Sequence, residues 1–397
     1  MEYIKLLKSN PKLLRLSTIQ LISYFGAWFT NVAIYTKLLD FGVGAFIISI
    51  VASLHFLPSV IQAPFVGALI DRFDIKRLML ILLVVELVST LSFLLVDSKE
   101  LLWLLFITLY IRMSASSFYF TSEMSLLPKI LKGNDLKLAN EIHSIIWSVS
   151  YSLGMALSGI FVYHFGSNMA FLTDALLFAI CIWLLLALDL NIQAEVVKNR
   201  IFDMIKEGFV YIKSNKKVLH LILLHSCVGL TAFDTLITLL ADTKYKYLIA
   251  TSLAIGFLNS IRAVALMLGP IFLSKFVNKQ SFFYLLLFQG ISIFIWATLQ
   301  ENFYLSLFGN FLTGIATTTL WSFTYTLLQE EIDSKFYGRV ISYNDMTFML
   351  IGVFTSLIIG TLAEFEVPLS VITMLIGSLF IITAFYYKFI LNRVLRN

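Results

Sequence analysis

The sequence predicts an all-α polytopic membrane protein with twelve transmembrane helices in two six-helix, pseudo-symmetric bundles. Composition is the first observation: the 397 residues are 59% hydrophobic and only 13% charged, whereas a soluble domain is about 45–50% apolar and about 25% charged. Apolar runs of membrane-spanning length along the whole chain are the second. A longer charged stretch that separates six runs from six is the third. Together they exclude a soluble single-core protein and a disordered chain.

A membrane-spanning helix needs roughly 20 predominantly apolar residues. Twelve stretches meet this requirement, at residues 14–39, 44–70, 78–97, 100–124, 138–164, 167–188, 217–242, 246–273, 281–299, 303–330, 340–364 and 367–390. The longest connection, 189–216, separates the predicted domains 1–188 and 217–397. Within it, apolar residues from Ile201 to Ile212 recur at helical spacing opposite a charged face. This pattern predicts an amphipathic helix on the membrane surface.

The distribution of lysine and arginine predicts the orientation. If both termini lie on one side, that side holds 23 Lys and Arg residues and the other side holds four. Loops on the cytoplasmic side carry the positive excess. We therefore expect a multi-pass protein of the cell (inner) membrane with both termini in the cytoplasm. The basic excess indicates contact with anionic membrane lipid and not with nucleic acid.

A weak internal repeat supports the two bundles. At an offset of 203 residues, Gly26 meets Gly229, Asn31 meets Asp234, and the segment IDRF at 70–73 meets LSKF at 273–276. Repeated halves with a substrate site near the midplane are a common plan of secondary transporters. Chance similarity between apolar helices is the alternative explanation.

Four of the predicted helices carry one polar stripe each. Residues at i, i+4, i+7 and i+11 lie along one side of an α-helix. The stripes are Tyr24, Trp28, Asn31 and Tyr35; Arg112, Ser116, Tyr119 and Glu123; Cys227, Thr231, Asp234 and Thr238; and Asn310, Thr313, Thr317, Trp321 and Thr324. Four such helices would surround one wet cavity, with Tyr325 adding to its aromatic wall. For a single threonine, a hydrogen bond to its own helix is the simpler explanation.

Charged residues inside these helices are the strongest candidates for function, because an ionisable group at helix centre costs at least about 2.5–3.5 kcal/mol. We expect Asp234 to carry a proton and Arg112 to act as a fixed cation that holds an anionic group or neutralises a carboxylate such as Asp234. Four further polar residues at membrane depth are either packing partners or direct participants: Glu86, Asp174, Arg262 and His55.

Enzyme, cofactor and metal chemistry find no support in the sequence. No GxxxxGK[ST], GxSxG or HExxH motif occurs, which argues against ATP-driven transport and the familiar hydrolases. His220, His225 and Cys227 raise the possibility of soft-metal transport, but their spacing does not place all three on one helix face. We therefore expect no cofactor and no metal site.

The loop GALIDRFDIKR at 67–77 resembles the signature G-x-L-x-D-R-x-G-R-K of the major facilitator superfamily. Gly67, Leu69, Asp71 and Arg72 match, Lys76 and Arg77 supply the basic pair displaced by one position, and Asp74 replaces the usual glycine. The resemblance implies a cytoplasmic gate. In such a gate Asp71 caps the helix that begins near Gly338–Arg339, because a helix N-terminus favours an anion. Arg72 would pair with Glu123.

Further segments are similar to the macrolide-efflux and enterobactin-exporter-like type of drug/proton antiporter. They are QLISYFGAWFTNVA (20–33), LPSVIQAPFVGALIDRFDIKR (57–77), LLPKILKGNDLKLAN (126–140), FLTDALLFAI (171–180) and YGRVIS (337–342). Many relatives carry a carboxylate directly after the glycine of the first helix, where this chain has Ala27. Proton coupling at that position would then have moved, for instance to Asp234, or been lost.

The leading hypothesis is a monomeric secondary active transporter that exports an amphipathic small molecule, drug or siderophore-like, by alternating access driven by protons. One alternative is a lipid or lysophospholipid flippase of the same fold. The other is a membrane receptor or scaffold that transports nothing. The proposed substrate and proton site comprises Trp28, Asn31, Tyr35, Arg112, Tyr119, Asp234, Trp321 and Tyr325, and the gating motif comprises Gly67, Asp71, Arg72, Lys76, Arg77, Glu123 and Arg339.

Overall fold

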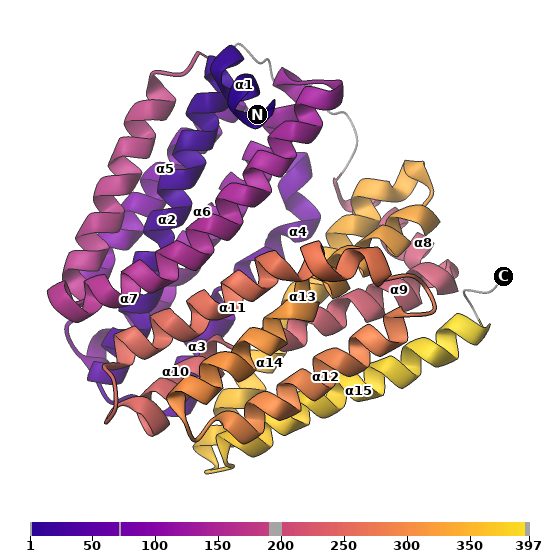
Figure 1. Ribbon diagram of the computed structural model, residues 1–397. Coiled ribbons are helices and arrows are strands. Elements are labelled where there is room, and N and C mark those ends of the chain that lie inside the picture. Colours follow the sequence, from indigo (N-terminus) through magenta and orange to yellow (C-terminus); the bar gives the residue numbers. More distant parts are fainter. Residues whose placement is uncertain (1, 71–72, 190–200, 394–397) are drawn as a thin grey trace. The chain divides into compact units, whose positions relative to one another are not determined.

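The computed structural model describes residues 2–70, 73–189 and 201–393, and its regular secondary structure in these ranges is helical (Figure 1). Nine segments of the described part are long and apolar enough to cross a membrane. One of them, α7 (Gly133–Leu186), turns at Gly166, whose φ of +78° suits glycine, and so provides two spans. The helices α2 (Pro11–Asp40) and α13 (Phe303–Glu331) have spanning length but more polar residues. With these the described part has twelve spans, and the predicted fold class is confirmed.

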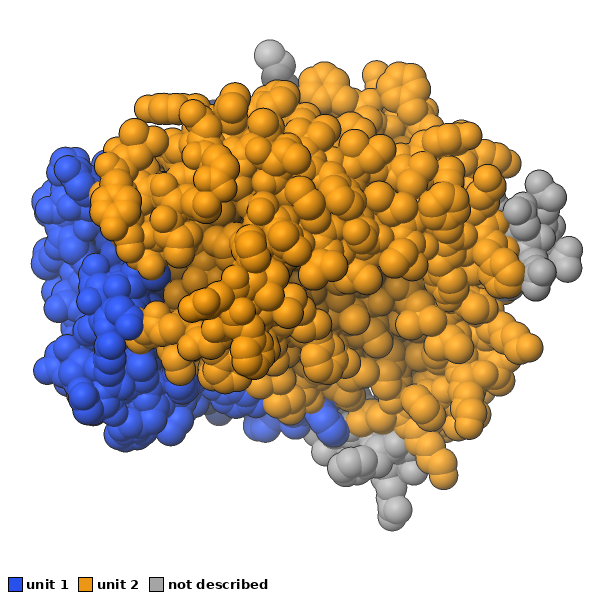
Figure 2. Space-filling view, turned by 90° about the horizontal axis from the view of Figure 1, so that it is seen from below, with its two compact units in different colours: residues 1–42, 65–198 blue, residues 43–64, 199–397 orange. Residues whose placement is uncertain are grey.

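Two compact units divide the chain (Figure 2). Unit 1 comprises Met1–Gly42 and Phe65–Lys198, and unit 2 comprises Val43–Pro64 and Asn199–Asn397. Besides α2 and α7, unit 1 contains α1 (Glu2–Ser9), α5 (Ile75–Ser92), η1 (Phe93–Leu95), η2 (Lys99–Leu101) and α6 (Leu102–Ile130). The helix α4 (Leu57–Ile70) crosses the boundary between the units.

Unit 2 holds most of the remaining helices. Besides α13 they are α3 (Ala45–Leu54), α8 (Ile201–Ser214), α9 (Lys216–Ser226), η3 (Cys227–Thr231), α10 (Asp234–Leu240), the π-helical turn η4 (Ala241–Tyr245), α11 (Thr251–Leu273), η5 (Ser274–Phe276), α12 (Phe282–Leu299), η6 (Ser334–Phe336), α14 (Tyr337–Glu364) and α15 (Leu369–Arg393).

The helix α3 packs in unit 2 against α14, although the sequence analysis placed it in a bundle over 1–188. The two helices touch at Gly360, where an added Cβ would lie 2.2 Å from Cβ of Ser49. Glu364, at the end of α14, accepts a hydrogen bond from the backbone N–H of Phe46 at 3.1 Å. It thereby caps the N-terminus of α3, since the N-cap residue Gly44 has no side chain to do so. The predicted division at 189–216 stays a prediction.

In unit 1, small residues bring α2 close to α7. A Cβ at Gly26 would lie 2.5 Å from Oδ1 of Asp174, and one at Gly154 would lie 2.6 Å from Cδ1 of Trp28. Glycines of this kind let membrane helices approach closely. The polar groups of α2 are therefore placed directly against those of α7.

In unit 2, two pairs of helices meet at glycines. The pair α11 and α13 is closest at Gly269, where a Cβ would lie 1.9 Å from the carbonyl oxygen of Ile315. The pair α12 and α15 meets at Gly290 and Gly377, where each added Cβ would come within 3.0 Å of the other glycine's carbonyl oxygen. The contact at Gly269 thus helps to position α13, which carries the predicted aromatic residues Trp321 and Tyr325.

Candidate functional site

A buried ion pair lies at the centre of unit 1. Nη2 of Arg112 (α6) contacts Oδ2 of Asp174 (α7) at 2.8 Å, and the two residues are 3% and 0% exposed. Nε of Arg112 donates to Oγ1 of Thr90 (α5) at 3.0 Å, and the hydroxyl of Thr30 (α2) donates to Oδ2 of Asp174. Burying opposite charges demands close pairing and further hydrogen bonds, which these threonines supply. One network thus joins four helices.

This network corrects the expected partner of Arg112. The sequence analysis considered Asp234, whereas the structure pairs Arg112 with Asp174 of the same unit. The guanidinium also lies 5.5 Å from the ring centroid of Phe178. Since spacing along the chain carries no information on which of several acids lies nearest, the sequence left this choice open. Arg112 therefore balances the charge of Asp174 within unit 1, while Oδ1 of Asp174 is buried without a hydrogen-bond partner among the described residues.

A second polar cluster in unit 1 contains buried carboxyl groups. Glu123 (α6) is 2% exposed, and no described residue hydrogen-bonds to its Oε2. One turn earlier, Tyr119 is 3% exposed and its hydroxyl also lacks a described partner. Glu86 (α5) is 4% exposed. Arg72, the predicted partner of Glu123, lies outside the described residues, so that pairing stays a prediction.

The span that contains Asp234 is interrupted. The helix α9 ends at Ser226, η3 follows, and Ala232 and Phe233 are not helical. Asp234, which is half-buried, opens α10. Nη2 of Arg262 (α11) donates to the carbonyl oxygen of Thr231 at 2.8 Å, and its guanidinium lies 5.0 Å from the Phe233 ring centroid. Arg262 thus satisfies a carbonyl that the break exposes.

The break shows that the predicted stripe from Cys227 to Thr238 was wrong. The steps of four and three residues require a continuous α-helix, which ends before Cys227 and begins again at Asp234. At Gly229 an added Cβ would lie 2.5 Å from the carbonyl oxygen of Phe348. This close approach of α14 leaves no room for a side chain at this position of η3, which explains the glycine.

The predicted stripe on α13 divides into packing residues and exposed ones. Asn310 donates from Nδ2 to the carbonyl oxygen of Leu258 at 2.8 Å, and Thr313 and Thr317 donate to carbonyl oxygens of their own helix. All three are buried. For these residues the simpler explanation, packing between helices, agrees with the contacts. Trp321, 37% exposed, remains available on this helix.

Aromatic pairs mark each unit. In unit 1, Trp28 stacks on Tyr151 with ring centroids 4.4 Å apart, while Asn31 and Tyr35 of the same helix are 7% and 1% exposed. In unit 2, Trp321 stacks on Tyr325 at 4.8 Å and 21° between the ring planes. Stacked rings offer apolar surfaces to a ligand. Because the rings are already held in place, they lose little conformational entropy when a ligand binds.

The loop that resembles the superfamily signature is described in part. Asp71 and Arg72 lie outside the described residues, and Gly67 lies in α4. Asp74, which replaces the usual glycine, accepts a hydrogen bond from the backbone N–H of Arg77 at 2.8 Å and caps α5. Nζ of Lys76 donates to the carbonyl oxygen of Leu186 at 3.1 Å, at the C-terminus of α7, where a cation is favoured.

Arg339, also assigned to the gate, holds the linker helix. Its Nη1 contacts Oε2 of Glu207 on α8 at 2.6 Å. Alongside, the hydroxyl of Tyr343 donates to the carbonyl oxygen of Ile205 at 3.0 Å, and Tyr211 stacks on Phe336 at 4.4 Å. These contacts dock α8 on the start of α14.

Replacing Glu207 with alanine is expected to loosen α8. The Glu207 side chain is 56% exposed, so the ion pair contributes about 0.5–1 kcal/mol. Amide hydrogen exchange over 205–214 should therefore accelerate about two- to fivefold. Replacing Lys213, an exposed residue of the same helix, is the control and should leave the exchange rates unchanged. Equal rates in wild type and the Glu207 variant would contradict this role.

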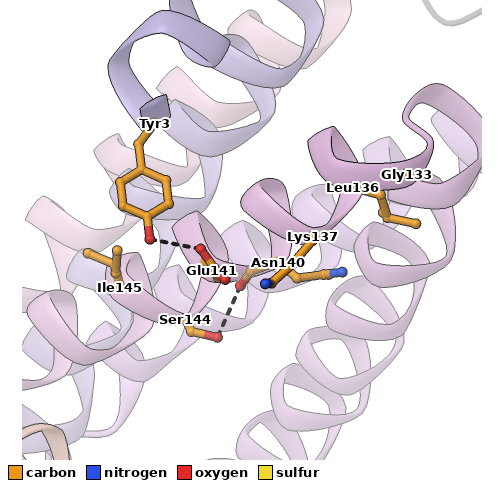
Figure 3. Close-up of a pocket in the computed structure, with 8 residues that line it drawn as sticks. All are labelled: Tyr3, Gly133, Leu136, Lys137, Asn140, Glu141, Ser144 and Ile145. Atoms are coloured by element: carbon orange, nitrogen blue, oxygen red, sulfur yellow. Dashed lines mark hydrogen bonds between the residues drawn. The ribbon is translucent and has the colours of Figure 1, made fainter. Parts of the chain in front are cut away.

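A separate pocket of about 710 Å³ lies beside α1 in unit 1 (Figure 3). The hydroxyl of Tyr3 donates to Oε2 of Glu141 at 2.7 Å across it, and this bond raises the pKa of Tyr3. Oγ of Ser144 donates to the carbonyl oxygen of Asn140 at 3.0 Å. The residues of the predicted substrate site all lie elsewhere.

The comparisons with known proteins agree with this architecture. The sequence matches the Major Facilitator Superfamily over residues 16–299. The chain belongs to the major facilitator superfamily. It is 22% identical to macrolide efflux protein A of Streptococcus pyogenes over 375 residues, 92% of each chain. It is 21% identical to macrolide efflux protein A of Enterococcus faecalis over 310 residues, 76% of this chain and 96% of the relative. The resemblance indicated by the motifs is confirmed.

Solved structures of the superfamily share the fold. The nucleoside transporter NupG superposes with a TM-score of 0.77 and 13% identity, covering 96% of this chain and 98% of that chain. A bacterial homologue of the iron transporter ferroportin, in an inward-facing state, gives a TM-score of 0.71 and 16% identity, with coverage of 95% and 98%. Because the chain belongs to this superfamily and has several apolar spans, it is a multi-pass membrane transporter of small molecules.

Sequence reasoning missed several partners in this major facilitator protein. Nε2 of Gln20 lies 2.6 Å from Nδ1 of His143, and Glu207 forms an ion pair with Arg339. His225 was considered as a metal ligand, whereas aromatic rings surround it. The signal in the sequence was a histidine within an apolar run. The aromatic neighbours of His225 could not be predicted from it, because they lie on helices about 100 residues away along the chain.

Proposed function

We propose that this transporter is a monomeric, proton-coupled exporter of amphipathic small molecules that works by alternating access. It would lie in the cell membrane with both termini in the cytoplasm. The observation that carries the proposal is the match to macrolide efflux protein A over 92% of both chains. Macrolides are large amphipathic compounds, so the match supports export of this class.

The aromatic residues support an adaptable binding surface. The stacked pair of Trp28 and Tyr151 belongs to unit 1, and that of Trp321 and Tyr325 to unit 2. Sites for small organic molecules are lined mainly by apolar and aromatic side chains, with few polar groups that fix orientation. We propose that Asn31, Tyr35 and Tyr119 extend this surface, and that Arg112 acts on it indirectly through its pair with Asp174.

Asp234 is the proposed proton carrier. Irregular backbone at membrane depth is tolerated where it is buried in protein or lines a cavity, and discontinuous helices build the ion sites of many secondary transporters. Asp234 directly follows such a break and is half-buried. This position beside irregular backbone supports the assignment of Asp234 as the proton carrier.

The gate predicted from the signature loop belongs to the same proposal. We propose that it closes the cytoplasmic side and opens during each cycle. Its residues are Gly67, Asp71, Arg72, Lys76, Arg77, Glu123 and Arg339.

Replacing Asp234 with asparagine is expected to abolish energised export, because asparagine cannot release a proton. We expect cells that express the wild type to accumulate less radiolabelled macrolide than cells without it, and an uncoupler to remove the difference. Cells with Asp234→Asn should accumulate as much as uncoupled cells. Asp242→Asn is the control and should export normally, since Asp242 is partly exposed and its Oδ1 lies 3.5 Å from Nζ of Lys246.

Each other outcome decides against part of the proposal. Normal export by Asp234→Asn would remove Asp234 from proton coupling. Export that persists with the uncoupler would favour the flippase alternative, which needs no proton gradient. Equal macrolide accumulation with and without the wild-type protein would reject the proposed substrate class.

A further inference from the structure

An aromatic box surrounds a histidine in unit 2. The ring of His225 (α9) lies 5.5 Å from Trp321 and 5.4 Å from Tyr325 of α13, and 5.6 Å from Phe348 of α14, between ring centroids. His225 is fully buried, whereas Trp321 is 37% exposed and forms the outer wall. The imidazole is therefore enclosed, and Trp321 reaches the surface of the protein.

We assign the tautomer of His225 from the hydrogen bonds of Thr324, whose hydroxyl also lies 3.0 Å from the carbonyl oxygen of Trp321. Oγ1 of Thr324 lies 2.8 Å from the carbonyl oxygen of Leu320 and 2.9 Å from Nδ1 of His225. A hydroxyl has one hydrogen, and a backbone carbonyl is purely an acceptor. The hydroxyl therefore donates to the carbonyl and accepts from Nδ1–H.

The other nitrogen, Nε2, is then an acceptor without a donor. It is buried, and no described residue hydrogen-bonds to it. A buried polar atom without a partner is costly, and in a native structure it calls for a reason. A ligand that brings an N–H or O–H into the box would supply the missing donor.

The charge around the box favours a cation. Aromatic faces attract ammonium groups. Asp345 lies three residues before Phe348 on α14, so the two side chains lie on the same side of that helix. A protonated amine combines the positive charge that the rings and Asp345 favour with the N–H that Nε2 lacks.

We propose that His225 and its aromatic box bind the protonated amine of an amphipathic substrate. The ammonium N–H donates to Nε2, while the alkyl groups and the positive charge lie against Trp321, Tyr325 and Phe348. This inference rests on the proposed export function and adds the substrate class: secondary and tertiary amines, in preference to quaternary ammonium compounds, which have no N–H.

Binding to purified protein in detergent tests the site without any gradient. The probes are a fluorescent aryl-alkyl dimethylamine and its N-methylated quaternary analogue. The wild type should bind the protonated amine about tenfold more tightly, the effect of one hydrogen bond to a charged group. His225→Phe keeps an aromatic ring but removes the acceptor, so it should lose this preference and change the affinity for the quaternary probe less than about twofold.

Two further variants make the result decisive. His225→Gln retains an acceptor and should keep a preference of at least about threefold, which tests the inference even if His225→Phe fails to fold. His220→Phe is the control, since His220 lies on the same helix and bonds the hydroxyl of Tyr386 at 2.6 Å. It should bind like the wild type.

Three outcomes would overturn the inference: a wild type that binds neither probe or both equally, a His225→Phe variant that keeps the preference, or a His225→Gln variant that loses it. The binding assay involves no transport. Selective amine binding together with failed export would therefore reject the proposed export function but still support the binding site at His225. Export of macrolide without selective amine binding would reject the site alone.

Discussion

Replacing Asp174 with alanine is expected to lower the free energy of unfolding by about 3–5 kcal/mol, because removing one partner of a buried ion pair leaves the other charge uncompensated. Arg112 is 3% exposed, so little of its side chain reaches solvent in unit 1. After the substitution, Thr90 would be the one described polar partner left to the Arg112 guanidinium. Denaturant unfolding of the purified protein in detergent micelles, followed by tryptophan fluorescence, measures the loss.

Two companion variants isolate the cause of that loss. Asp242→Ala removes a partly exposed acid that pairs with Lys246 and should lower the free energy of unfolding by less than about 1 kcal/mol. The double variant Arg112→Met/Asp174→Leu removes both buried charges and should recover most of the stability. An Asp174→Ala protein as stable as Asp242→Ala would show that the network contributes little.

Replacing Gly269 with alanine is expected to be the most damaging of the small substitutions. The added Cβ would lie 1.9 Å from the carbonyl oxygen of Ile315, which belongs to the backbone of α13 and cannot turn away. The helices α11 and α13 would have to separate, and overpacking of this kind costs about 3 kcal/mol, the upper end of its usual range. The same unfolding assay gives the value.

Gly338→Ala provides the matched comparison. Nothing lies within 4 Å of the Cβ that it would add, in the first turn of α14. Alanine favours a helix over glycine by up to about 1 kcal/mol, so this variant should be neutral or slightly more stable. If both alanine variants unfolded at the same denaturant concentration, the close contact at Gly269 would be contradicted.

The membrane helices were largely predictable because the bilayer imposes length and composition. The predicted runs 281–299 and 303–330 agree with α12 (Phe282–Leu299) and α13 (Phe303–Glu331) to within one residue. The run 217–242 was not predicted correctly in detail. It is predominantly apolar, and hydropathy does not distinguish an α-helix from a 3₁₀ segment. The 3₁₀ segment η3 contains Gly229, which lies in close contact with α14.

The partners of the polar residues were less predictable. The sequence analysis named Asp234 as an example of a carboxylate near Arg112, whereas the observed partner, Asp174, depends on how α2, α5, α6 and α7 pack. That packing follows from glycines such as Gly26, whose neighbours the sequence does not reveal. The aromatic residues Trp321 and Tyr325 were recognised, but His225 was not connected with them, because the contact joins α9 to α13.

Transport by the purified protein in liposomes tests the central claim, export in exchange for protons, most directly. With the lumen more acidic than the outside, proteins whose cytoplasmic face is outward should release protons from the lumen and drive radiolabelled macrolide inward. We predict uptake above that of protein-free liposomes, lost with Asp234→Asn and with an ionophore that collapses the gradient. Protein-dependent uptake that is the same with and without the gradient would contradict proton-coupled export.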